Sequence, residues 1–279
     1  MMIKAFGATD IGKLRENNED NFLIFRPVLK QEGDIGTDYS TENGVLLLVA
    51  DGMGGAAAGE TASAMAVATA KACLEEYHTQ NTSLELMQIS ILTAQKGCQM
   101  IVQDRPELSG MGTVATYVYV KNNKADIAQI GDTRLYLYRN KSLEQLTEDQ
   151  NLVTELVKAG LITLEQAQYH PQKNAVTQAI GALDDVNPYF YTLEVQKGDI
   201  LLLCSDGLTN MVSDLEIQLA LDSSADLQNI PSILIDTANA NGGYDLEDRV
   251  FEVSPDAQPA FTEFTNIGQL TDVDNLVRS

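Results

Sequence analysis

The segment VLLLVADGMGG, residues Val45 to Gly55, joins a wholly apolar run to an aspartate and a group of glycines. Such a run is typical of a buried strand, and the glycine after Asp51 permits a sharp turn or a close approach of the backbone. The same form recurs where IAQI leads to Gly131-Asp132 and where LLLCS leads to Asp206-Gly207. A fourth candidate, Asp245, follows two glycines just before the last predicted strand.

The pattern of an apolar strand followed by aspartate and glycine recurs in separate parts of the chain. This recurrence favours a single site to which these aspartates contribute oxygen ligands together. Asp-Gly is a common turn dipeptide, so any single example is more simply explained as a turn. The cluster RENNED, Arg15 to Asp20, adds candidates directly before another predicted strand. Either Glu19 or Asp20 is a candidate metal ligand, and the Arg15 guanidinium could bind two phosphate oxygens at once. The simpler alternative for this cluster is an exposed, salt-bridged turn.

Carboxylates without histidine or cysteine partners suit hard cations, so the pattern predicts Mg²⁺ or Mn²⁺ rather than Zn²⁺. An acidic calcium-buffering protein is a weaker interpretation, because no calcium-binding loop with a closing glutamate occurs in the sequence.

Grouped strands and helices predict antiparallel sheets layered with helices, because strict alternation would instead indicate a parallel sheet. Asn122-Asn123 predicts a tight hairpin turn. The predicted strands are 3–9, 21–26, 45–50, 114–120, 125–130, 134–138, 189–195, 200–204 and 249–253. The predicted helices are 59–77, 84–102, 152–159, 214–221 and 231–241.

Composition limits the classes of partner. The 18 Lys and Arg against 40 Asp and Glu give a net charge of -22, which repels nucleic acid and anionic membranes. Three separated cysteines in apolar contexts and no apolar leader at the start predict a cytoplasmic protein. We expect one domain over residues 1–253, a tail over 254–279 and a monomeric state.

Several elements, in the same order along the chain, resemble the PP2C (PPM) family of metal-dependent protein phosphatases. Arg15 to Asp20 is similar to R-x-x-N-[QE]-D, Val49 to Gly55 to the D-G-x-G-G element, and Ser109 to Thr113 to the M-G-T-T region. Gly131 to Arg134 is similar to G-D-S-R and Ser205 to Leu208 to S-D-G-L. Between these two, His170 to Gly181 resembles the segment after the family's mobile flap.

This resemblance implies an α+β fold, a four-layer α-β-β-α sandwich with two central antiparallel sheets and a flap over residues 148–171. It also implies that Asp51 bridges two metals and that the Gly52 carbonyl, Asp206 and Asp245 complete the first site. Glu19 or Asp20 would support the second of these two core ions, and Asp132 with Asp206 would hold a third, weaker ion. The implied activity is serine/threonine phosphoprotein hydrolysis on phosphorylated proteins.

The chemistry implied is an in-line attack at phosphorus. A water that bridges two cations is acidified toward neutrality, so its hydroxide can attack without a covalent phosphoenzyme. Arg15 and the ions would offset the charge on the phosphate oxygens.

The sequence departs from the family pattern at two places. Asp245 is followed by Leu246 where the family has asparagine, which puts its role as a ligand in doubt and makes Asp248 a conceivable substitute. Gln178 stands where many relatives have arginine. These departures leave a second hypothesis open, a pseudophosphatase that keeps the fold as a binding or sensing module.

Overall fold

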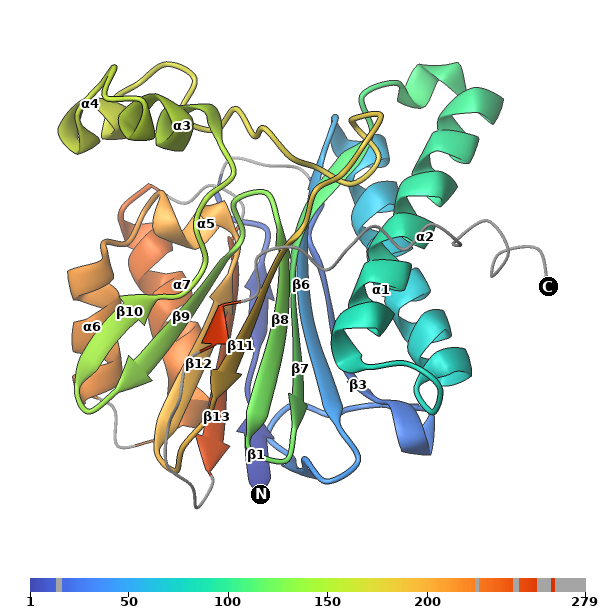
Figure 1. The fold of residues 1–279 in the computed structure, drawn as a ribbon. Coiled ribbons are helices and arrows are strands. Elements are labelled where there is room, and N and C mark those ends of the chain that lie inside the picture. The colour runs from blue at the N-terminus through green and yellow to red at the C-terminus, as the bar shows by residue number, and fades with distance from the viewer. Residues whose placement is uncertain (14–16, 224–225, 243–245, 255–261, 264–279) are drawn as a thin grey trace.

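Two antiparallel sheets stack face to face and carry helices on their outer faces (Figure 1). The computed structural model describes residues 1–13, 17–223, 226–242, 246–254 and 262–263, the last two ranges by backbone alone. Within these residues, the first sheet has the strand order β10-β9-β12-β13-β1-β5, with β2 also paired to β13. Its strands are β1 Met2–Ala5, β2 Ala8–Asp10, β5 Asp38–Ser40, β9 Arg134–Arg139, β10 Ser142–Gln145, β12 Asp199–Cys204 and β13 Leu246–Ser254.

The second sheet has the order β14-β11-β8-β7-β6-β3-β4. Its strands are β3 Asn21–Arg26, β4 Gln31–Glu32, β6 Val45–Met53, β7 Gly112–Lys121, β8 Lys124–Ile130, β11 Tyr189–Glu194 and β14 Thr262–Glu263. The helices are α1 Ala56–Tyr77, α2 Ser83–Asp104, α3 Leu152–Lys158, α4 Leu164–Gln168, α5 Asp206–Thr209, α6 Asp214–Ser223 and α7 Ile230–Ala240. Short 3₁₀ turns are η1 Pro27–Leu29, η2 Pro106–Leu108 and η3 Leu227–Asn229.

The first six residues of strand β6, 45–50, are all apolar because both faces of the strand are covered there. Val45, Leu47 and Val49 enter the core between the two sheets, whereas Leu46 and Leu48 pack against the helices outside. Successive side chains of a strand point to opposite faces, so a strand in the middle of four layers has no solvent face.

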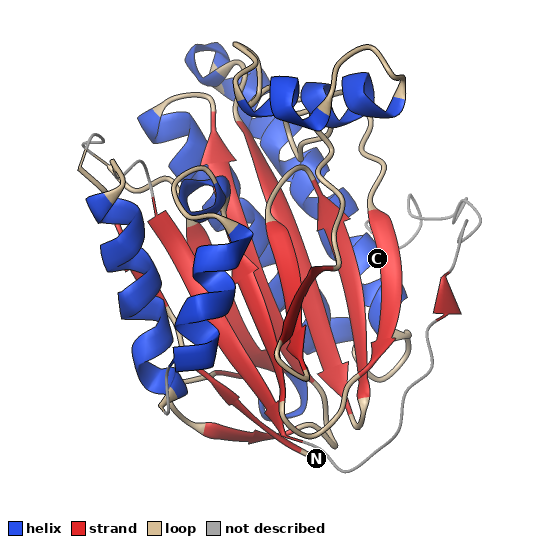
Figure 2. Cartoon of the chain, turned by 90° about the vertical axis from the view of Figure 1, so that its left-hand side faces the viewer, coloured by secondary structure: helices blue, strands red, loops and turns tan. Residues whose placement is uncertain are grey.

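Helices α1 and α2 cover the second sheet, and α6 and α7 cover the first (Figures 1 and 2). Ala66 and Ala70 of α1 are fully buried against the sheet, and their small side chains let the helix lie close to it. On the opposite side, Ile217 of α6 and Leu234 of α7 pack against Tyr136 and Leu202. The predicted four-layer α-β-β-α sandwich is therefore confirmed.

The predicted elements are found with modest shifts at their ends, and the differences are local. The expected strand 3–9 is divided into β1 and β2, which pair with β13 in one continuous register. The Asn122-Asn123 turn joins β7 to β8 as predicted, with Asn122 at φ 54°. The unpredicted elements include β4, β5, β10, α4 and α5, each too short for its hydrophobic period to stand out.

The proposed flap, residues 148–171, contains α3 and α4 and projects from the end of the sandwich at the top of Figure 1. Of the proposed tail, residues 255–261 and 264–279 lie outside the described residues, and Thr262–Glu263 pairs with β11. No helix of the described part combines the length and apolar character needed to cross a membrane.

Candidate metal centre

Strand register brings the predicted aspartates together in two pairs. In the second sheet Asn21 pairs with Ala50, so the next residues along, Asp20 and Asp51, stand opposite each other. In the first sheet Cys204 pairs with Arg134 at the end of β12 and β9, and Asp206 and Asp132 follow at that same end, where the charge of Asp206 helps to raise the pKa of Asp132. The electrostatic effect of Asp20, Asp132 and Asp206 on Asp51 shows that the two pairs lie close together.

The carboxylates of this cluster are buried beside one another, and this raises their pKa values. Burial is the main reason that the pKa of Asp51 lies well above its ordinary value, followed by the charges of Asp20, Asp206 and Asp132. Burial, then the charges of Asp206 and Asp149, raise the pKa of Asp132 to about 8, although Arg134 opposes them. Every charge that raises the pKa of Asp51 is acidic, so a cation would relieve this repulsion.

The donors are all carboxylate oxygens, which fits a hard divalent cation. These carboxylates lie near one another but do not form a complete coordination sphere. In the described part of the chain, no three His, Cys, Asp or Glu side chains are arranged closely enough to hold a metal ion. Asp206 begins α5, and Asn210, one helical turn later, donates from Nδ2 to Asp206 Oδ2 at 2.9 Å. The Asp51 carbonyl accepts a 2.6 Å bond from Thr113 Oγ1.

Of the two local reasons expected for a glycine at position 52, a sharp turn or a close backbone approach, the structure shows the second. The chain does not turn there, because β6 continues through Asp51 and Gly52 to Met53, paired along its length with β7. The turn comes at Gly54 and Gly55, with φ 112° and 92°. A side chain at Gly52 would put a Cβ 2.4 Å from the carbonyl oxygens of Glu19 and Gly59. Glycine is therefore required because other backbone segments press against the strand.

The same close packing gives the two N-terminal candidates, Glu19 and Asp20, different surroundings. The Glu19 side chain is 4% exposed and lies against the first turn of α1, where a Cβ on Gly59 would be 2.1 Å from Glu19 Oε2. Its carbonyl accepts a 2.6 Å bond from Ser63 Oγ. Asp20, in contrast, lies beside Asp51, where its charge is the largest cause after burial of the raised pKa of Asp51. Asp20 is thus the closer of the two to the aspartate cluster.

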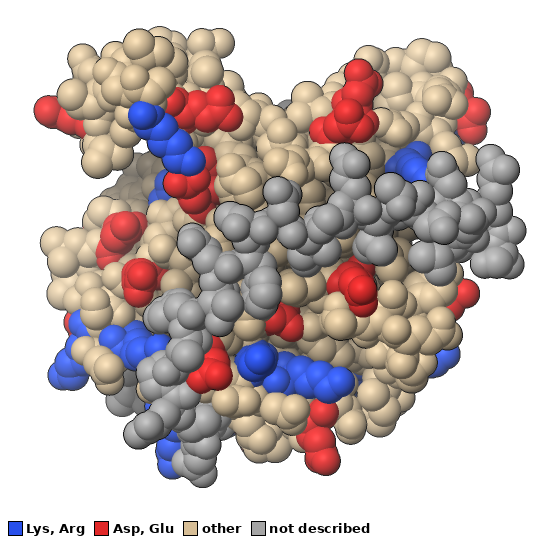
Figure 3. All heavy atoms as spheres, in the orientation of Figure 1, with Lys and Arg blue, Asp and Glu red and all other residues tan. Residues whose placement is uncertain are grey.

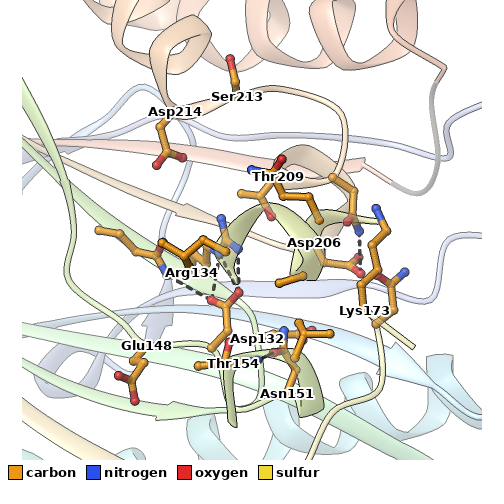
Figure 4. A pocket seen from close by; sticks show the side chains of 18 of the residues that line it. Asp132, Arg134, Glu148, Asn151, Thr154, Lys173, Asp206, Thr209, Ser213 and Asp214 are labelled. Carbon is orange, nitrogen blue, oxygen red and sulfur yellow. Dashed lines mark hydrogen bonds and ion pairs between the residues drawn. The ribbon is translucent and has the colours of Figure 1, made fainter. Parts of the chain in front are cut away.

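A cleft of about 1000 Å³ opens beside Asp132 and Asp206, between the flap and the segment that joins α5 to α6. At a different place from this cleft, between the flap and the end of α2, Figure 3 shows the molecule hollowed at its upper edge, with acidic side chains on both sides of the hollow. Figure 4 shows the cleft from close by, with Asp132, Arg134, Lys173 and Asp206 among the residues that line it. The flap walls include Val157 and Leu164, so the cleft offers both charged and apolar surface.

Two predicted site residues, Arg15 and Asp245, lie outside the described residues. Strand β13 begins one residue after Asp245, and its Asp248 pairs with Cys204, so this strand starts at the sheet edge where Asp206 stands. Gln178 Oε1 accepts a 2.8 Å bond from the Asn187 amide. Asn210 was not predicted from the sequence, although its spacing of four residues from Asp206 at a helix start could have indicated the contact.

Comparison with known proteins gives the family. A protein phosphatase 2C model matches residues 33–240. The chain belongs to the protein phosphatase 2C family. The serine/threonine phosphatase stp of Listeria monocytogenes is 37% identical over 240 residues, covering 85% of this chain and 90% of that protein.

Solved phosphatase 2C structures have the same architecture. A serine/threonine phosphatase from S. agalactiae superposes with a TM-score of 0.81 at 34% identity, over 90% of this chain and all of that one. The catalytic domain of the phosphatase PstP, in complex with two manganese ions, gives a TM-score of 0.74 at 30% identity, over 90% and 97% of the two chains. The fold of this chain is therefore that of solved serine/threonine phosphatases.

Proposed function

We propose that this chain is a metal-dependent protein phosphatase that hydrolyses phosphoserine and phosphothreonine in phosphorylated proteins. One observation carries the proposal, namely the buried aspartate cluster of a phosphatase 2C chain beside an open cleft. The relatives named as serine/threonine phosphatases support the choice of substrate.

Asp51, Asp206, Asp132 and Asp20 are the side chains proposed to hold the divalent ions, with the Gly52 carbonyl and Asp245. Glu19 is the remaining alternative to Asp20. The PstP complex with two manganese ions supports Mn²⁺ as a cation that suits this fold. When bound, such ions supply a water-derived nucleophile near neutral pH and offset phosphate charge.

The protein's own residues prepare the site. Asn210 and Thr113 fix the Asp206 carboxylate and the Asp51 backbone, so these groups lose little freedom when a ligand binds. The cleft receives the phosphorylated side chain and its neighbours, because Asp132 and Asp206 form part of its wall. Arg15 is the proposed partner of the phosphate oxygens.

Purified protein in Mn²⁺ is expected to hydrolyse p-nitrophenyl phosphate and a phosphothreonine peptide. EDTA should abolish both activities, and added Mn²⁺ should restore them. Ion binding should also stabilise the fold, by about 2.7 kcal/mol when free Mn²⁺ is 100 times the dissociation constant. Phosphate release and thermal unfolding are the two measurements.

Other results would point to the alternatives. Folded protein that binds Mn²⁺ but releases no phosphate from any substrate would favour the pseudophosphatase module. Several tight Ca²⁺ sites without phosphatase activity would favour the calcium-buffering interpretation.

A further inference from the structure

The flap is joined to the sandwich through a short segment, residues 147–151, which we call the flap root. Residues of the flap root form hydrogen bonds with residues before and after Asp132 in the chain. The Leu135 amide donates to Thr147 Oγ1 at 2.9 Å, and Gln129 Nε2 donates to the Glu148 carbonyl at 2.9 Å. The Arg134 guanidinium forms a two-pronged ion pair with Asp149, at 2.9 Å from Nε to Oδ1 and 2.6 Å from Nη2 to Oδ2 (Figure 4).

Gln150 makes the central contact of this series. The Gly131 amide donates to Gln150 Oε1 at 2.7 Å, and the Gly131 carbonyl accepts from the Gln150 amide at 3.0 Å. Both main-chain groups of the residue before Asp132 are therefore bonded to one flap-root residue. Gln150 is 5% exposed and does not line the cleft, so it has no direct path to a substrate held there.

Gly131 has little freedom to adopt another position. Its φ is 85°, and a Cβ there would lie 2.0 Å from Val114 Cγ1. Residues 131–133, the Asp132 loop, are thus pressed against β7 on one side and held by Gln150 on the other. The direction in which the Asp132 side chain points therefore depends on both contacts.

Gln150 also joins the chain that enters the flap to the chain that leaves it. The Thr177 amide donates to the Gln150 carbonyl at 2.8 Å, and the Leu152 amide to the Ala175 carbonyl at 2.8 Å. Gln150 Nε2 donates to the Asn187 carbonyl at 3.2 Å. Gln150, through its buried side chain and its backbone, thereby connects three segments: the flap root, residues 175–187 after the flap, and the Asp132 loop.

We propose that Gln150 is a positioning residue that fixes the Asp132 carboxylate to the flap root, so that the flap base and this carboxylate move as one body. The inference rests on the proposed function, in which Asp132 helps to hold a weakly bound divalent ion. Substitution of Gln150 should therefore weaken that ion, although Gln150 touches neither the ion nor the substrate.

The test compares Gln150→Met with Gln95→Met. Gln95 is a matched control, because it is also 5% exposed and its Oε1 accepts the Gly181 amide at 2.6 Å, in a loop without candidate ligands. Calorimetric titration of the metal-free proteins with Mn²⁺ should give a dissociation constant for the weakest ion about 10-fold higher in Gln150→Met, as for other residues that orient a ligand. The tighter sites of this variant, and all sites of Gln95→Met, should stay within about twofold of wild type.

Kinetics supply a second signature. At low Mn²⁺, Gln150→Met should turn over a phosphothreonine peptide more slowly than wild type, and saturating Mn²⁺ should restore kcat without a change in KM. A general loss of structure would not be repaired in this way. If Gln150→Met does not fold, Gln150→Asn replaces it, since asparagine keeps the amide but is one methylene too short to reach Gly131.

Unchanged Mn²⁺ affinities in a folded Gln150 variant would overturn the proposal. Equal weakening in Gln95→Met, or no Mn²⁺ binding by the wild-type protein, would do the same. Wild-type protein that binds Mn²⁺ but does not hydrolyse the peptide would instead contradict the proposed function, while the titrations would still decide the role of Gln150.

Discussion

Asp51→Asn is expected to reduce phosphopeptide turnover by more than about 100-fold, beyond the loss usual for residues that only orient a ligand. The reason is its central place, since Asp20, Asp132 and Asp206 all act on it. A neutral amide in that place removes an anionic oxygen donor from the middle of the proposed site. Steady-state phosphate release at saturating Mn²⁺ measures the loss.

The same substitution should stabilise the metal-free protein. A carboxylate whose folded-state pKa is raised costs stability when it is ionised, so the wild-type free energy of unfolding should fall as pH rises from about 4 toward 8 or above. Asp51→Asn removes one buried charge, and with it the repulsion that Asp20, Asp206 and Asp132 exert on that carboxylate. At pH 8 we expect a gain of about 1–2 kcal/mol, or a few degrees in Tm.

Asp34→Asn is the control, because Asp34 is exposed in the loop between β4 and β5 and is not among the charges that act on Asp51. It should change neither turnover nor stability appreciably. A metal-free Asp51→Asn protein less stable than wild type would show that the carboxylates do not repel one another as described.

Gly52→Ala is expected to destabilise the protein by at least about 3 kcal/mol, at the upper end of the cost of overpacking. The added methyl would meet two carbonyl oxygens at 2.4 Å, those of Glu19 and Gly59, and neither backbone can move without displacing β3 or α1. Urea unfolding in EDTA measures the effect without a contribution from bound ions.

Gly160→Ala provides the comparison for this backbone contact. Gly160 has a φ of 70°, but nothing lies within 4 Å of the position that an alanine methyl would take, so only the left-handed conformation opposes alanine there. Its cost should be about 1 kcal/mol. Similar losses for the two variants would mean that the contacts around Gly52 relax easily.

Local patterns were sufficient for the layered fold. The nine predicted strands are found because five to seven residues of apolar or alternating sequence were enough to mark each one. The apolar run before Asp51 reflects a strand with helices on one face and a sheet on the other. Elements of two to five residues, such as β5 and α4, were missed because one turn or one strand pair carries no readable period.

The amino-acid pattern was therefore enough to mark the longer strands and helices and to single out the aspartates at the strand ends. The tertiary structure places Asp20 opposite Asp51 and brings Asp206 close to Asp132, because strand pairing joins residues far apart in the chain. It also decided why residue 52 must be glycine and that Gln150 holds Gly131. Such contacts depend on where distant backbones meet, and no local periodicity records that.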